Sequence, residues 1–226
     1  MSGHGEGGAV RRLLRPARQE TYEQVFATVY VALMTNVLLA IACAPLLAAL
    51  AIVRDPLASW PFFAVLSLPC GPALAGAFGC FEALNRGSTS VLRAFWGAYR
   101  RAAPRALAVW AAGAAVVSVL AVDAVTVART AWGPALVPFF CTAAALVMSL
   151  TFALLTSIDE RPRTPAVLFL VARRWYLSAA VLVVLGLVVA VILVKPVLGL
   201  LVLASPLLYA AWATTRFVVA PATTSP

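Results

Sequence analysis

Two polar side chains in long apolar segments are the strongest candidates for chemistry, Asn36 and Asp123. If such a segment crosses a membrane, an acidic group within it is by default a functional candidate, because burying a charge in lipid is costly. Asp123 lies near one end of its segment, where it can instead pair with a basic residue. Asn36 lies in mid-segment, where interhelical hydrogen bonding and ligand contact are the two alternatives. The candidate partners of Asp123 are Arg54, Arg129 and Lys195.

The other reactive residue types do not combine into a familiar catalytic or metal-binding pattern. The only histidine, His4, lies in a Gly-rich N-terminal stretch, so a Ser-His-Asp triad is not expected. The four cysteines form no Cys-x-x-Cys pair and are interpreted as small apolar packing residues. We therefore expect no enzyme, no cofactor and no metal site. The cysteines are Cys43, Cys70, Cys80 and Cys141.

Composition places these residues in a membrane protein. Of the 226 residues, 63% are hydrophobic and 11% are charged, whereas soluble domains carry roughly 25% charged residues. A helix needs about 20 apolar residues to cross a bilayer, and six stretches reach or approach that length. We expect an all-α polytopic membrane protein with about six transmembrane helices in three hairpins. The six stretches are 25–53, 57–83, 106–128, 134–157, 177–194 and 197–218.

These stretches leave room for one domain. Residues 1–20 are predicted to be a disordered basic tail, 21–219 a single transmembrane domain, and 220–226 a C-terminal tail. Proline removes a backbone donor and bends helices. We therefore expect a bend at Pro45 in the first span and breaks at Pro69 and Pro72 in the second.

The second span carries a small residue at every fourth position, including Gly71, Ala75 and Gly79. Such a stripe lets two helices approach closely in lipid, so a helix-packing face is expected, with a substrate path as the alternative. At the end of this span, Glu82 and Arg86 are four residues apart and are expected to pair.

Two polar connections are predicted to form short helices in the plane of the membrane surface. In the first, Leu92, Phe95, Trp96 and Tyr99 recur at helical spacing and alternate with arginines. An apolar face backed by arginine suits anionic lipid headgroups, and a partner protein is the alternative. The basic residues assigned to these two contact surfaces are Arg93, Arg100, Arg101, Arg173 and Arg174.

The basic residues also predict the orientation. Short loops rich in arginine stay in the cytoplasm. Placing both termini and the two polar connections inside leaves only Arg54, Arg129 and Lys195 of the 17 basic residues outside. Because the net charge of +9 is spread between the apolar segments, nucleic acid is not an expected partner. Tryptophan is enriched in belts at the two membrane boundaries. Trp60 and Trp132 are expected near the outer boundary and Trp96 and Trp175 near the inner one, and Trp110 is the exception.

The chain resembles the YesL-like bacterial membrane proteins, a family defined as a domain of unknown function. The resemblance is carried by Asn36, by Pro45, by the Gly-Pro-Ala at 71–73, and by the inner connection VLRAFWGAYRRAAPRAL. The actinobacterial type is the most similar, because AVDAV ends the third span and Arg-Arg-Trp precedes the fifth. The resemblance implies a polytopic plasma-membrane protein with a link to carbohydrate uptake and without an established activity.

We therefore expect an accessory or regulatory membrane protein linked to solute uptake, with a transporter complex as its partner. The alternative is a small transporter or channel that uses the Pro-broken second span and Asp123.

Overall fold

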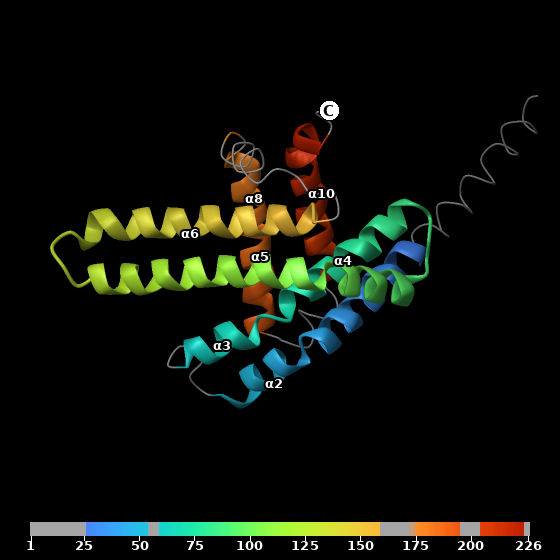
Figure 1. The fold of residues 1–226 in the computed structure, drawn as a ribbon, viewed down its shortest axis with the longest axis horizontal. Coiled ribbons are helices and arrows are strands. Elements are labelled where there is room, and N and C mark those ends of the chain that lie inside the picture. The colour runs from blue at the N-terminus through green and yellow to red at the C-terminus, as the bar shows by residue number, and fades with distance from the viewer. Residues whose placement is uncertain (1–25, 54–58, 159–172, 174, 195–203, 224–226) are drawn as a thin grey trace, which may run out of the picture.

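Helices make up most of the chain that the structure, a computed structural model, describes (Figure 1). The described residues are 26–53, 59–158, 173, 175–194 and 204–223, and no strand occurs among them. The all-α prediction is confirmed for these residues, while the tail 1–20 and most of the second inner connection lie outside them. The helices are Phe26–Ala42, α2 (Ala44–Ile52), α3 (Trp60–Leu66), α4 (Cys70–Asn85), α5 (Val91–Val127), α6 (Gly133–Thr156), α8 (Trp175–Val194) and α10 (Ala204–Thr223).

The first two apolar stretches are each a pair of helices joined at a bend. The Phe26–Ala42 helix meets α2 at 68°, and α3 meets α4 at 40°. Pro45 lies in the first turn of α2, and Pro69 is the N-cap of α4, so neither position can donate the hydrogen bond that would continue the preceding helix. The bends predicted at Pro45 and Pro69 are confirmed. Pro72 breaks nothing, because it lies in the first turn of α4, where its missing N–H is not needed.

Helices α5 and α6 are the two described helices that are long and apolar enough to cross a membrane. They lie side by side and antiparallel, joined at residues 128–132 (Figure 1). Counting each bent pair as one span raises the number to four. The apolar helices therefore indicate a membrane-embedded protein, and the six-span arrangement stays a prediction.

Helix α5 corrects the expectation of a separate surface helix in the first inner connection. The helix runs without interruption for 37 residues and contains Pro104. A proline within a helix removes one hydrogen bond, in this case from the carbonyl of Arg100, which is at the exposed surface. Helix-favouring alanine, arginine and leucine residues on both sides of Pro104 continue the helix. The predicted surface helix and the predicted third span are thus parts of one continuous helix.

Helix α4 packs on the N-terminal part of α5. A Cβ built on Gly79 would overlap Ala98, and one on Gly71 would lie 2.7 Å from the Cβ of Trp110. Phe95 is fully buried, and its ring lies 3.0 Å from the position of a Cβ on Gly76. Phe95 therefore faces α4, not lipid as expected. Helix α4 lies beside residues 94–110 instead of beside the apolar part of α5 that follows.

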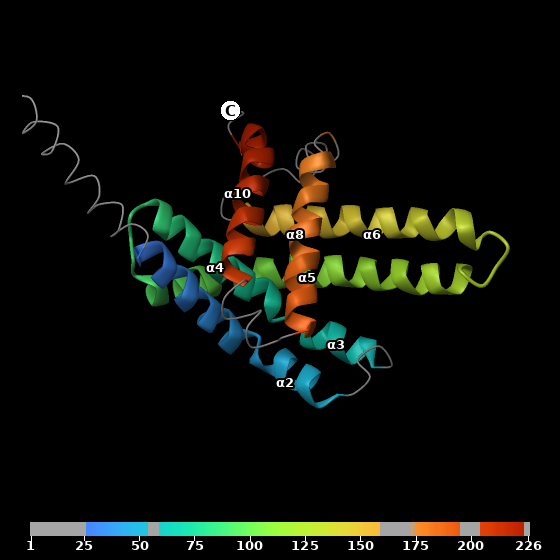
Figure 2. The ribbon, with the colours of Figure 1, turned by 180° about the vertical axis from the view of Figure 1, so that it is seen from behind.

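Helices α8 and α10 pack against each other and run across the α5–α6 hairpin, not along it (Figures 1 and 2). The ring of Phe81 in α4 contacts the rings of Tyr209 and Trp212 edge-on or tilted, with centroids 5.3 and 5.9 Å away, which fixes α10 on α4. The predicted stack of three hairpins is therefore not confirmed. Helix α10 also continues to Thr223, into the expected tail at 220–226.

The glycine contact yields a stability prediction. We expect Gly79→Ala to destabilise the protein by about 1–3 kcal/mol, because the added methyl overpacks the contact with Ala98. Gly186→Ala is the matched control: nothing lies within 4 Å of its new Cβ, and alanine is the better helix former by about 1 kcal/mol. The apparent melting temperatures of the two variants in detergent measure these effects. A Gly79→Ala variant as stable as Gly186→Ala, or more stable, would contradict the close contact of Gly79 with Ala98.

Candidate functional site

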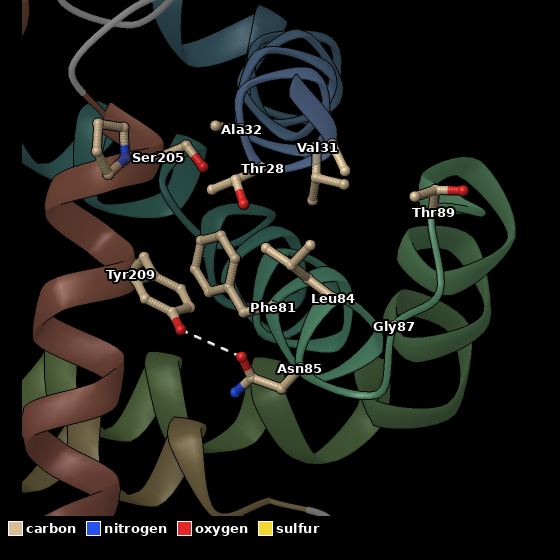
Figure 3. Close-up of a pocket in the computed structure, with 12 residues that line it drawn as sticks. Thr28, Val31, Ala32, Phe81, Leu84, Asn85, Gly87, Thr89, Ser205 and Tyr209 are labelled. Atoms are coloured by element: carbon tan, nitrogen blue, oxygen red, sulfur yellow. Dashed lines mark hydrogen bonds between the residues drawn. The ribbon is translucent and has the colours of Figure 1, made fainter. Parts of the chain in front are cut away.

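A pocket of about 760 Å³ lies where the Phe26–Ala42 helix, the end of α4 and the first turns of α10 meet (Figure 3). Its lining joins residues that are far apart in the sequence, from Thr28 to Tyr209. Apolar side chains, among them Val31, Phe81 and Leu84, form part of the wall. A concave site with a mainly apolar wall and a few polar groups is the usual form of a small-molecule site.

The polar groups of the pocket are neutral. Thr28, Asn85, Thr89, Ser205 and Tyr209 line it, and none of its described lining residues is acidic or basic. The Tyr209 hydroxyl donates a hydrogen bond to Asn85 Oδ1 at 3.1 Å, which links α10 to the end of α4. The described lining of the pocket therefore offers hydroxyl and amide groups, and no charged group, to a ligand.

Ser205 is the most informative of these residues. It is 1% exposed, and its hydroxyl has no hydrogen-bond partner among the described residues. Figure 3 shows the hydroxyl directed from α10 toward the Phe26–Ala42 helix. A buried hydroxyl without a partner costs about 1–3 kcal/mol, so the fold holds a polar group in the wall of the pocket at a net cost.

The end of α4 is shaped by its sequence so that Asn85 faces this pocket. Gly87 has a φ of 75°, a left-handed conformation that glycine adopts without steric cost. Gly87 N donates to Leu84 O at 2.8 Å, and Ser88 N donates to Ala83 O at 2.9 Å. This pair of bonds is the Schellman ending of a helix. It turns the chain sharply and brings Gly87 and Thr89 to the rim.

A second polar feature lies at the break between α3 and α4. Ser67 Oγ donates to Ala64 O at 2.7 Å and accepts a bond from Trp110 Nε1 at 3.2 Å. The indole of Trp110 is thus used at a helix break inside the protein, which explains why this tryptophan does not fit the aromatic belts. Breaks of this kind need such partners, because lipid offers none.

The two polar candidates from the sequence do not meet in the pocket. Asn36 is fully buried in the Phe26–Ala42 helix and does not line the pocket. Asp123 is exposed near the C-terminal end of α5 and does not line the pocket. The ion pair of Glu82 with Arg86, predicted from their spacing, is present at 3.9 Å, whereas none is found for Asp123 among the described residues.

The remaining predicted residues divide between interior and surface. Gly71, Ala75 and Gly79 are on α4, where Ala75 is buried and the two glycines touch α5. The arginines assigned to lipid or partner contact, and Trp96 with them, are exposed wherever they are described, and Arg174 lies outside the described residues. The exposed ones are Arg93, Trp96, Arg100, Arg101 and Arg173.

Comparison of the chain with protein-family models, with curated proteins and with solved structures finds no match. Within the described part of the chain, no group of three or more His, Cys, Asp or Glu residues is placed to hold a metal ion. Sequence reasoning missed Asn85, Ser205 and Tyr209. The available signal was the spacing of Ser205 and Tyr209, which puts two hydroxyls on one face of an apolar helix.

The cost of the Ser205 hydroxyl can be measured. We expect Ser205→Ala to raise stability by about 1 kcal/mol, since it removes a buried polar group without a partner. Ser149→Ala is the control, because Ser149 is also buried and without a partner among the described residues but lies outside the pocket. Melting temperatures in detergent should rise for both variants. A clear fall for Ser205→Ala would show that its hydroxyl already has a partner.

Proposed function

We propose that this chain is a multi-pass plasma-membrane protein that binds a neutral small molecule in its pocket and serves as an accessory or regulatory component of solute uptake. The observation that carries the proposal is the Ser205 hydroxyl, which has no hydrogen-bond partner among the described residues and lies in the wall of a pocket whose described lining carries no charge. Because Ser205 is 1% exposed, its side chain must rotate toward the pocket to another rotamer, and a ligand hydroxyl would then supply the missing partner. The protein would then recover on binding the stability that it gives up when empty.

Carbohydrate is the solute class that we propose. A sugar presents several hydroxyls together with an apolar ring face, and the pocket presents hydroxyls and an amide beside the Phe81 and Tyr209 rings. A charged ligand would lose part of its hydration without gaining an opposite charge from the described lining, which is unfavourable. The resemblance to YesL-like proteins, which implies a link to carbohydrate uptake, favours the same class.

The placement of the charged residues supports an accessory role. Asp123, the acid that a transporter would use, lies near the C-terminal end of α5, and α5 contributes none of the described residues that line the pocket. The exposed Arg93, Arg100 and Arg101 project from the part of α5 that packs beside α4. Under this proposal they contact anionic lipid headgroups or a subunit of a transporter complex.

A transporter in its own right is the second candidate. It is favoured by the two broken helix pairs, bent by 68° and 40°, because discontinuous helices frame the substrate sites of many transporters. In this reading Asp123 and Asn36 contribute to the solute path.

The orientation follows from the basic residues and can be tested directly. We expect a reporter fused after Thr130 to lie outside the cell and a reporter near Ser90 to lie inside, because arginines retain short loops in the cytoplasm. Both termini should be cytoplasmic. Paired fusions to alkaline phosphatase, which is active outside, and to green fluorescent protein, which fluoresces inside, report the side of each fusion point. Phosphatase activity of the Ser90 fusion would show that the topology is the reverse of the predicted one.

Ligand binding is tested with the purified protein. A panel of neutral mono- and disaccharides should contain one that raises the melting temperature of the native protein, while matched sugar acids do not. Ser205→Ala should need about tenfold more sugar to give the same rise in melting temperature, because it loses one hydrogen bond of about 1.4 kcal/mol. Ser149→Ala should bind like the native protein.

The accessory role adds a second readout. The native protein should co-purify in mild detergent with transporter subunits and should carry no sugar by itself into proteoliposomes. If the protein alone carries sugar into proteoliposomes, and if Asp123→Asn abolishes that uptake, the protein is instead a transporter in its own right. Melting temperatures that no neutral sugar changes would contradict the carbohydrate assignment.

A further inference from the structure

Two cysteine side chains meet at the bends of the first two helix pairs. Cys43 lies between the Phe26–Ala42 helix and α2, and Cys70 is the first residue of α4. Their sulfur atoms are 3.4 Å apart, although 27 residues separate them in the sequence. Neither residue is fully buried. The contact therefore joins the bends of the first and second helix pairs.

The other two cysteines differ from this pair. Cys80 is buried, and its thiol donates to Val91 O at 3.6 Å. Cys141 is exposed on α6 and has no thiol neighbour among the described residues. A zinc site would need further ligands, and no group of three or more His, Cys, Asp or Glu residues occurs in the described part of the chain. Within the described residues, the Cys43–Cys70 pair is thus a dithiol and not part of a larger donor set.

We propose that Cys43 and Cys70 form a reversible disulfide that ties the bend of the first helix pair to the break before α4. The bonded sulfur distance is about 2.05 Å, so the two sulfurs must approach by about 1.4 Å, which rotation of the two side chains can supply. The disulfide closes a loop that contains α2 and α3.

The oxidant is a disulfide, carried by a dithiol oxidoreductase or by a small thiol compound. One cysteine sulfur attacks the external disulfide and gives up its proton, which forms a mixed disulfide and releases one external thiol. The second cysteine then displaces the other external thiol. The pair loses two electrons and two protons, and the external disulfide becomes two thiols. Reduction follows the same steps in reverse.

The test counts free thiols in the full-length protein in membranes. After treatment with oxidised glutathione, denaturation and labelling with a polyethylene-glycol maleimide, we expect two of the four thiols to be lost. Treatment with dithiothreitol should restore all four. Mass spectrometry of the digested protein should find one cross-linked peptide pair, containing Cys43 and Cys70. The oxidised protein should also melt at a higher temperature, because the closed loop restricts the unfolded chain.

Variants assign the bond. Cys43→Ala and Cys70→Ala should each abolish the loss of label, while Cys80→Ala and Cys141→Ala should retain it. Labelling of all four thiols after oxidation, a cross-link through Cys80 or Cys141, or a glutathione adduct without an internal cross-link would each overturn the proposal. Because the peptide analysis uses the native chain, the result does not depend on any variant folding.

Discussion

The close approach of α4 to α5 is the contact on which the rest of the structure depends. Gly71 and Gly79 bring the two backbones together, and the space beside Gly76 is filled by the Phe95 ring. Larger residues at any of these positions would separate the helices by the width of a side chain. Because α4 is held in this place, its last turn carries Phe81 and Asn85 to the point where α10 and the first helix meet.

This packing also sets the depth of the elements in a membrane. At 1.5 Å per residue, α5 is about 55 Å long, well beyond the roughly 30 Å of hydrocarbon in a bilayer. Residues 106–127 alone span about 33 Å, and the arginines Arg93, Arg100 and Arg101 precede them. Under the proposed orientation, α4 and the pocket therefore lie toward the cytoplasmic surface, beside the arginine-bearing part of α5. A soluble ligand or partner would reach them there.

Local chemistry was predictable from the sequence, and long-range pairing was not. The bends at Pro45 and Pro69 follow from the missing backbone donor of proline, and the pairing of Glu82 with Arg86 follows from one helical turn. The course of α5 through Pro104 was missed, because a break at proline is a tendency that flanking helix formers overcome. The pocket was missed because hydroxyls such as Ser205 gain meaning only from neighbours more than 100 residues away.

The two cysteines and the pocket are connected by a single rigid element. The Phe26–Ala42 helix contributes Thr28 and Val31 to the pocket wall and ends directly before Cys43. Thr28 lies 14 residues from Ala42, or about 21 Å along the helix axis. A tilt of about 5° at the bend therefore moves Thr28 by about 2 Å, enough to break a hydrogen bond. A bond that fixes Cys43 would hold that wall, and with it the distance from the first helix to Ser205.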